Sequence, residues 1–127
     1  YATLDEHPRV VTLVGTGLFD FGDVDGVGAT VRLQHPLGVA WLDGALYVAD
    51  SYNHKIKRLD PDSRRVTTLA GSGEHGLLDG AGAIARFWEP GGIAAGGGWL
   101  YVADTNHHAI RRVSPTDGAV TTIRLRL

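Results

Sequence analysis

Two histidine–aspartate pairs recur in this sequence at a spacing that could bind a metal ion. His54 follows Asp50 by four residues, and His108 follows Asp104 by the same interval. Residues that recur in every unit of a repeat protein can form a ring, and a ring of imidazoles can bind a divalent cation. The simpler interpretation needs no ligand: each histidine hydrogen-bonds across the turn between two strands, while its aspartate accepts hydrogen bonds from backbone N–H groups. We expect this structural role for all four residues.

An acidic loop near the N-terminus offers a second set of oxygen ligands. Asp20, Asp23 and Asp25 lie in the segment FDFGDVDGVG, with a spacing loosely similar to that of a calcium-binding loop. The segment lacks the distal glutamate of such a loop, and a related segment later in the chain keeps only Asp79. Asp-Gly pairs are also what a tight turn requires, because glycine adopts positive φ without steric cost. A structural turn is therefore the first interpretation, with a calcium site as the alternative.

Other catalytic patterns are missing or incomplete. The glycine words at 15–17 (GTG) and 71–73 (GSG) each follow a strand-like run. Neither is followed by G-K-[ST] or by a helical pattern, which argues against a phosphate-binding loop. This sequence has no cysteine, which excludes thiolate metal sites and a cysteine nucleophile, and it lacks G-x-S-x-G. The sequence therefore assigns no reaction.

Basic residues cluster in two related segments and raise the question of nucleic acid. The clusters are Lys55, Lys57, Arg58, Arg64 and Arg65, and then Arg111, Arg112, Arg124 and Arg126. Stacking of single-stranded bases needs aromatic rings among the charges, and Tyr52 is the only ring beside the first cluster. The formal net charge is −2, so no global field attracts a polyanion. We expect these side chains to be solvated or to pair between repeat units, and RNA binding is the alternative.

A few side chains remain as candidates for binding a partner. Trp88 lies beside Phe87 on a linking loop, and Trp99 follows three glycines. Large rings on loops often anchor partners, but they also complete surface packing, and both interpretations stay open. His107 is extra to the repeated histidine and lies on a loop. The binding candidates are Trp88, Trp99, Tyr52 and His107.

These residues belong to two copies of one repeat. When the sequence is shifted by 54 positions, Asp25–Thr68 aligns with Asp79–Thr122 with 21 identities in 44 positions. Each copy contains four short apolar runs separated by turn residues such as Asp43-Gly44, without sustained helical periodicity. The predicted strands are 38–42, 46–50, 55–60, 66–70, 92–95, 100–104, 109–114 and 120–124, preceded by a hairpin of 3–5 and 10–15. The chain is therefore predicted to be all-β.

Four-stranded antiparallel units repeated every roughly 40–55 residues are typical of β-propeller blades. We therefore predict a partial propeller of about two and a half blades that forms a single domain over 1–127. Residues 1–17 are expected to supply the last two strands of a preceding blade, 38–71 the first full blade, and 92–124 the second. A flat antiparallel sandwich is the alternative, but a sandwich does not require the same strand sequences to occur twice.

The repeated words resemble the NHL repeat, which is named for its Asn-His-Leu signature. The first copy carries Pro36, Gly38–Ala40, Leu46–Asp50 and Asn53-His54, and the second carries Pro90, Gly92–Ala94, Leu100–Asp104 and His107-His108. His107 stands where the asparagine is expected, and Asn106 lies one position earlier. The linking loops are similar to those of propellers that accompany thioredoxin-like domains. The resemblance implies a six-bladed or similar propeller used as a binding scaffold, with Asn53 among its structural residues, and it does not imply a reaction.

The main functional hypothesis is a non-enzymatic NHL-type module that binds a protein or ligand and needs no cofactor. Its alternatives are a metal-dependent propeller enzyme (a lyase or hydrolase) and an RNA-binding propeller, although nucleic acid is not expected. An open stack of blades leaves apolar faces in water, so we expect either self-association or the remaining blades of a longer chain to cover them. No segment approaches the about 20 apolar residues of a membrane span, and no signal peptide is recognised. The sequence leaves the cellular compartment unknown.

Overall fold

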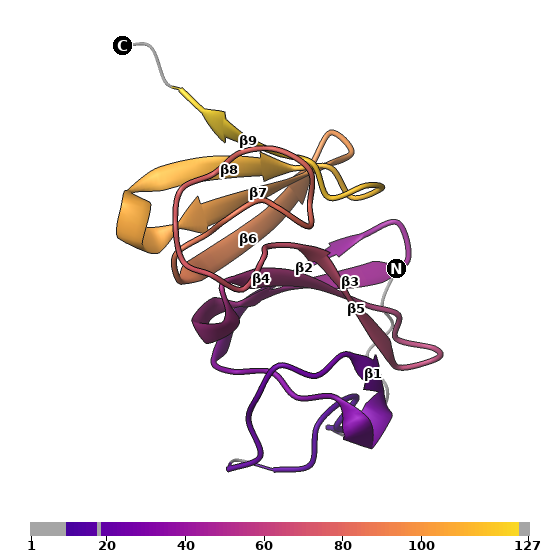
Figure 1. The fold of residues 1–127 in the computed structure, drawn as a ribbon. Helices are drawn as coiled ribbons and strands as arrows, with labels where there is room; N and C mark the ends of the chain where they lie inside the picture. Colours follow the sequence, from indigo (N-terminus) through magenta and orange to yellow (C-terminus); the bar gives the residue numbers. More distant parts are fainter. Residues whose placement is uncertain (1–9, 18, 125–127) are drawn as a thin grey trace.

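The computed structural model describes residues 10–17 and 19–124, which fold into two antiparallel β-sheets that stack on one another (Figure 1). The first sheet has the order β1-β5-β4-β3-β2 and the second β6-β7-β8-β9. The strands of the first sheet are β1 (Gly26–Val27), β2 (Pro36–Leu42), β3 (Ala45–Asp50), β4 (Lys55–Leu59) and β5 (Arg65–Ala70). Those of the second are β6 (Pro90–Gly96), β7 (Trp99–Asp104), β8 (Ala109–Val113) and β9 (Val120–Ile123). We call β2–β5 the first blade and β6–β9 the second, and the all-β propeller-type fold agrees with the prediction.

The strands from residue 36 onward begin and end within two residues of the predicted bounds. The local turn chemistry explains this agreement. Asp43 and Gly44 both adopt positive φ, 48° and 84°, as a two-residue hairpin between β2 and β3 requires. In each blade a 3-10 turn joins the second strand to the third, namely η2 (Ser51–Asn53) and η3 (Thr105–His107). Each turn ends on a histidine in the left-handed conformation, His54 or His108.

The N-terminal segment differs from the prediction. The expected strand over 10–15 is not formed, while its partner over 3–5 lies outside the described residues. The segment instead runs over one side of the first blade, where the backbone N–H of Gly15 donates to the carbonyl of Gly28. A short strand, β1, then pairs antiparallel with β5. A strand needs a ladder partner to satisfy its backbone groups, and here the edge of β5 is paired with β1.

The side of the first blade that faces this N-terminal segment is called its front, and the side toward the second blade its back (Figure 1). The main core lies between the back of the first blade and the side of the second blade that faces it, which is called the front of the second blade. It joins Ala45, Tyr47, Ala49, Ile56 and Ala70 to Leu100, Val102, Val113 and Val120, with Ala85 and Phe87 from the linking loop. Close approach of the innermost strands depends on glycine, because a Cβ on Gly38 would lie 2.4 Å from the carbonyl oxygen of Gly91.

A second, smaller cluster lies on the front of the first blade. It consists of Val31, Leu59 and Val66, with Leu13, Val14, Leu33 and Leu46 packed against them. In the described part of the chain, no helix has the length and hydropathy that crossing a bilayer requires.

Candidate binding face and the polar joints that hold it

Each blade carries a fully buried aspartate at the end of its second strand. The Oδ1 atom of Asp50 accepts the backbone N–H of Gln34 at 2.7 Å, and Oδ1 of Asp104 accepts that of Trp88 at 2.8 Å. Gln34 and Trp88 each lie two residues before the first residue of an innermost strand, β2 or β6, so each aspartate fixes the end of the incoming loop. Burial raises the pKa of Asp50 above its ordinary value, although hydrogen bonds from Gln34 and Asn53 oppose this effect.

The second oxygen of each aspartate contacts the 3-10 turn that follows it. Asn53 Nδ2 donates to Asp50 Oδ2 at 2.8 Å, and His107 Nδ1 lies 3.1 Å from Asp104 Oδ2. His107 therefore occupies the position of Asn53 in the second blade. The interpretation of His107 as extra to the repeat was wrong, because the ring nitrogen reaches the same carboxylate as the asparagine amide.

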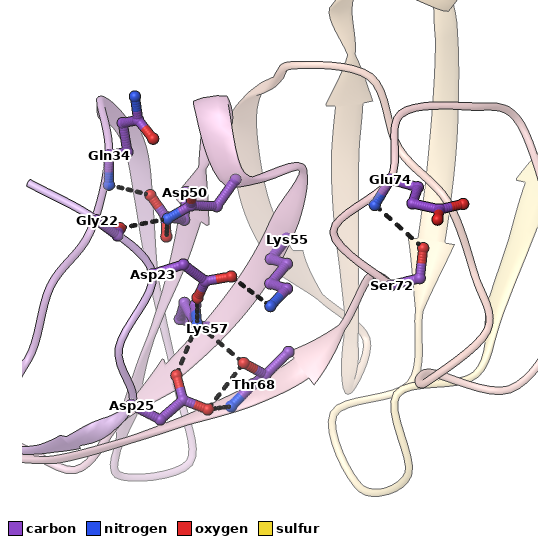
Figure 2. A network of polar contacts seen from close by, with 11 residues as sticks. Gly22, Asp23, Asp25, Gln34, Asp50, Lys55, Lys57, Thr68, Ser72 and Glu74 are labelled. Carbon is purple, nitrogen blue, oxygen red and sulfur yellow. Dashed lines mark hydrogen bonds and ion pairs between the residues drawn. The ribbon is translucent and has the colours of Figure 1, made fainter.

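The acidic loop binds lysine side chains (Figure 2). Lys57 Nζ lies 2.6 Å from Asp23 Oδ1 and 2.6 Å from Asp25 Oδ1, and Lys55 Nζ contacts the other oxygen of Asp23. Asp25 also accepts both the backbone N–H and the hydroxyl of Thr68. Burial alone would raise the pKa of Asp23, but hydrogen bonds and charges from Lys55 and Lys57 outweigh it and hold the pKa below its ordinary value.

Asp20 takes no part in the contacts of the buried aspartates or in the aspartate–lysine contacts, because its carboxylate accepts the hydroxyl of Thr16 at 2.8 Å. The three candidate calcium ligands therefore do not converge on one point, and two of them neutralise ammonium groups. Within residues 10–17 and 19–124, no group of three or more His, Asp or Glu side chains is placed to hold a metal ion.

Arg111 is the counterpart of Lys57 in the second blade, and its guanidinium is fully buried. One nitrogen donates to Asp104 Oδ2 at 2.7 Å and to the carbonyl of Arg86, and the other donates to Asp79 and to the carbonyl of Leu78. Of the two alternatives expected for the basic residues, solvation does not hold for Lys57 and Arg111, which are buried and pair with aspartates of the loops. Loop aspartates 32 residues away reach over and pair with them.

Three imidazoles and one indole form a row where the two blades meet, which we call the aromatic row: His54, His75, Trp88 and His107. The Trp88 ring stacks on His75 with centroids 4.8 Å apart, and its edge meets His107 at 5.7 Å. His75 in turn meets His54 at 5.9 Å. Trp88 is 38% exposed, although its backbone is held by Asp104.

The first residue of the row joins the blades directly. His54 Nδ1 accepts the backbone N–H of Glu89 at 3.0 Å, and the Glu89 carboxylate accepts Asn106 Nδ2 at 2.7 Å. Burial, followed by the neighbouring His75, lowers the pKa of His54 against the opposing charges of Glu89 and Asp104.

The four predicted binding residues are thus separated. Trp88 and His107 meet in the aromatic row, whereas Tyr52 stacks on His35 at 4.2 Å on the equivalent turn of the first blade. Trp99 lies at the opposite end of β7 from η3, 4.1 Å below the guanidinium of Arg112. Sequence reasoning missed His75. The glycine segments at 15–17 and 71–73 are 56 residues apart, and at this offset His75 aligns with another aromatic residue, Phe19, which is its only sequence signal.

Antiparallel four-stranded blades that stack face to face through an apolar core, each with the same buried aspartate at the end of its second strand, are typical of a β-propeller repeat protein. The chain belongs to the NHL-repeat family, since the sequence profile of the NHL repeat matches residues 33–59 and 87–113. It is 55% identical over 103 residues to Protein SUPPRESSOR OF QUENCHING 1, chloroplastic, of Arabidopsis thaliana, covering 80% of this chain and 10% of that protein. It is 54% identical over 99 residues to the human NHL repeat-containing protein 2, covering 74% of this chain. The chain spans only 14% of the length of that second relative.

Solved structures share the fold. An auxiliary nutrient binding protein from Bacteroides thetaiotaomicron matches with a TM-score of 0.67 and 28% identity, over 80% of this chain and 26% of its own. A putative phosphatase from the same organism matches with a TM-score of 0.69 and 23% identity, over 91% of this chain and 27% of its own. The second likeness concerns the fold alone.

Proposed function

We propose that this chain is a non-enzymatic binding module and that the aromatic row, together with Glu89, is part of the surface that binds a protein or ligand partner. The single observation that supports the proposal is that Trp88 is held in place and yet partly exposed. Its backbone is fixed by a buried carboxylate and its ring is held between two imidazoles, yet 38% of the residue is exposed. Rigid, half-exposed tryptophans are typical binding hot spots, because little conformational entropy is lost when a partner covers them.

The contacts of the charged residues favour a binding scaffold over a catalytic site. Lys57 pairs with Asp23 and Asp25, and Arg111 pairs with Asp79. Asp79 also accepts the backbone N–H of Thr122, so these contacts position the loops. The basic residues that suggested RNA binding are partly engaged in the same contacts. One of the similar solved structures is that of an auxiliary nutrient binding protein, which is consistent with a binding role for this kind of sheet.

The chemistry of the row predicts the partner. The exposed indole and imidazole faces favour a planar or apolar group, and the neighbouring Glu89 carboxylate favours a hydrogen-bond donor beside it. A short peptide with an aromatic or apolar side chain next to a basic or amide group has both features. We therefore expect recognition of a protein segment of this kind.

Selection of displayed peptides on the purified chain tests the proposal. We expect selected peptides to change the fluorescence of Trp88, to lose binding in Trp88→Ala, and to keep binding in Trp99→Ala, which removes a ring of similar exposure at the other end of the blade. Circular dichroism of both variants checks the fold. Peptides that bind the two variants equally would place the binding surface elsewhere. Stoichiometric, tightly held zinc or calcium in purified protein would instead favour the enzyme alternative.

A further inference from the structure

The segment from Trp88 to Pro90 carries both groups of the proposed binding surface, the indole and the Glu89 carboxylate, and the second blade holds it at three points. Asp104 Oδ1 accepts the backbone N–H of Trp88 at 2.8 Å, and the Trp88 carbonyl accepts the backbone N–H of Asn106 at 3.3 Å. The Asn106 side chain donates to the Glu89 carboxylate at 2.7 Å. These contacts fix the segment to the end of β7 and to η3.

The first blade holds the same segment from the other side. His54 Nδ1 accepts the backbone N–H of Glu89 at 3.0 Å, and the hydroxyl of Ser51 donates to the carbonyl of Pro90. Ser51 begins η2 and His54 follows it, so both belong to the turn between β3 and β4. The segment therefore bridges the two blades, and one of its five contacts depends on a neutral imidazole.

Glu89 depends on these contacts because its backbone is strained. Its φ is 53°, in the left-handed region that residues other than glycine, asparagine and aspartate rarely adopt. Such a conformation costs free energy and persists only where surrounding contacts hold it. Loss of the hydrogen bond to the Glu89 N–H would remove one of these contacts, at the residue whose carboxylate belongs to the proposed surface.

Protonation of His54 breaks this hydrogen bond in a pH range where the other four contacts keep their donors and acceptors. An imidazolium carries a proton on both ring nitrogens, so Nδ1 can no longer accept the N–H of Glu89. The serine hydroxyl and the asparagine groups do not titrate, and Asp104 is paired with the buried guanidinium of Arg111. Histidine is the side chain whose ordinary pKa lies between pH 5 and 8.

The His54 ring faces titratable side chains from three other segments. His75 of the linking loop meets it edge-on with centroids 5.9 Å apart, and the carboxylates of Glu89 and Asp104 act on it from just before β6 and from the end of β7. Lys55, the next residue on β4, is engaged by the acidic loop. Burial, followed by His75, lowers the pKa of His54, and the two carboxylates oppose this effect without reversing it. The ring therefore takes up its proton below pH 6.5, in mild acid.

We propose that His54 is a pH-sensitive contact: its neutral ring holds the segment from Trp88 to Pro90 in place, and its protonation releases Glu89. That the aromatic row then loses its partner rests on the proposed function. The protonated ring repels the N–H that it held and attracts the Glu89 carboxylate, which the proposed surface offers to a donor of the partner. The chain therefore binds its partner at neutral pH and releases it in mild acid.

The free chain tests the release without any partner. The amide resonance of Glu89 and the ring resonances of His54 are followed by NMR between pH 7.5 and pH 5. We expect the Glu89 amide to move with a single midpoint below pH 6.5 that equals the midpoint of the His54 ring. The amide of Trp88, whose acceptor is Asp104, should move less. A Glu89 amide that does not follow the His54 ring would overturn the proposal.

Two histidine variants assign the titration to one ring. His54→Asn keeps an acceptor that does not titrate, so the midpoint at the Glu89 amide should disappear. His108→Asn is the matched control, because His108 ends η3 with φ 51° as His54 ends η2 with φ 55°, and its replacement should leave the midpoint unchanged. A midpoint that persists in His54→Asn and disappears in His75→Gln would assign the titration to His75 and contradict the proposal. The dispersion of the amide spectrum checks the fold of each variant.

A histidine-free displayed peptide selected on the wild-type chain at pH 7.5, whose binding Trp88→Ala abolishes, tests the effect on binding. We expect its affinity to fall between pH 7.5 and pH 5.5 by at most about tenfold, because one proton with a pKa below 6.5 is involved. His54→Asn should lose less, and by linkage the bound peptide should lower the midpoint of the His54 ring. Equal affinity at both pH values would refute the regulation. If no such peptide is found, the proposed function fails, while the titration of the free chain still decides whether His54 releases Glu89.

Discussion

Asp104 and Arg111 form an ion pair in which both side chains are fully buried and the donor and acceptor atoms lie 2.7 Å apart. The equivalent residues of the first blade, Asp50 and Lys57, are also buried, but Lys57 extends to Asp23 and Asp25. The forked guanidinium of arginine has enough donors to reach two carboxylates and two carbonyls, whereas a single ammonium group reaches fewer. The two blades therefore neutralise a buried cation at equivalent positions with different sets of carboxylates.

Replacing Arg111 by methionine should strongly destabilise the protein. The change keeps an apolar stem but leaves the Asp104 carboxylate buried without its cation, which costs about 3–5 kcal/mol. Urea unfolding followed by circular dichroism measures the loss. Arg112→Met is the control, because Arg112 only covers the ring of Trp99 and its loss should cost about 1 kcal/mol. Equal effects of the two changes would contradict the role assigned to Arg111.

Acid should unfold the protein through its loop aspartates. Interactions with Lys55 and Lys57 lower the pKa of Asp23 in the folded state despite burial, and those with Thr122 and Arg111 do the same for Asp79. A carboxyl whose folded pKa is depressed contributes stability above its unfolded pKa, about 3.8, and this is lost as pH falls through the lower folded value.

Unfolding midpoints in urea between pH 6 and pH 2.5 test this expectation, because the decline should begin near pH 4–5. Asp23→Asn and Asp79→Asn should each flatten the curve while lowering stability at neutral pH. Asp50 acts in the opposite direction, since its folded pKa is raised and its protonation in acid relieves a buried charge. A curve that is unchanged in both variants would show that other carboxyls govern the acid transition.

His54 should make stability depend on pH in a second, milder range. Its folded pKa lies below the ordinary 6.5, so the unfolded chain binds the proton first and stability falls as pH drops from about 6.5 toward the folded pKa. The physical cause is burial of the ring, followed by the neighbouring His75, and protonation would also remove the acceptor for the N–H of Glu89. His54→Asn keeps a side-chain acceptor and tolerates the φ of 55°. Thermal melts of this variant should change less between pH 7 and pH 5 than those of the wild type.

Gly15 and Gly71, which begin the glycine segments at 15–17 and 71–73 and have φ of 85° and 105°, should respond differently to alanine. In Gly71→Ala, the new methyl group meets the carbonyl oxygen of His54 and the backbone of Lys55, in addition to the strain of positive φ. Gly15→Ala carries only the strain, roughly 1 kcal/mol. Thermal melts of both variants, followed by circular dichroism, measure the effect on the fold. A Gly71→Ala loss no larger than that of Gly15→Ala would show that the two turns are not as differently packed as the structure indicates.

Much of this protein is determined by the sequence alone, because the signals are local. Strand positions from residue 36 onward follow from apolar runs bounded by turn residues, and Asp43-Gly44 specifies its hairpin through the positive φ that both residues adopt. The repeat offset predicts equivalent residues without knowledge of the fold. It also identified the NHL words that the family profile matches.

Only the tertiary structure decided how distant segments meet. Lys57 and Arg111 stand in charged strands that are typical of a solvated edge, and their burial depends on aspartates more than 30 residues earlier in the chain. His75, Trp88 and His107 come from a loop, a loop end and a turn whose separation in sequence has no period. A strand over 10–15 was expected from its residues, but a strand forms only where another supplies hydrogen bonds. Local pattern fixes the elements, whereas burial and partner choice depend on which surfaces folding brings together.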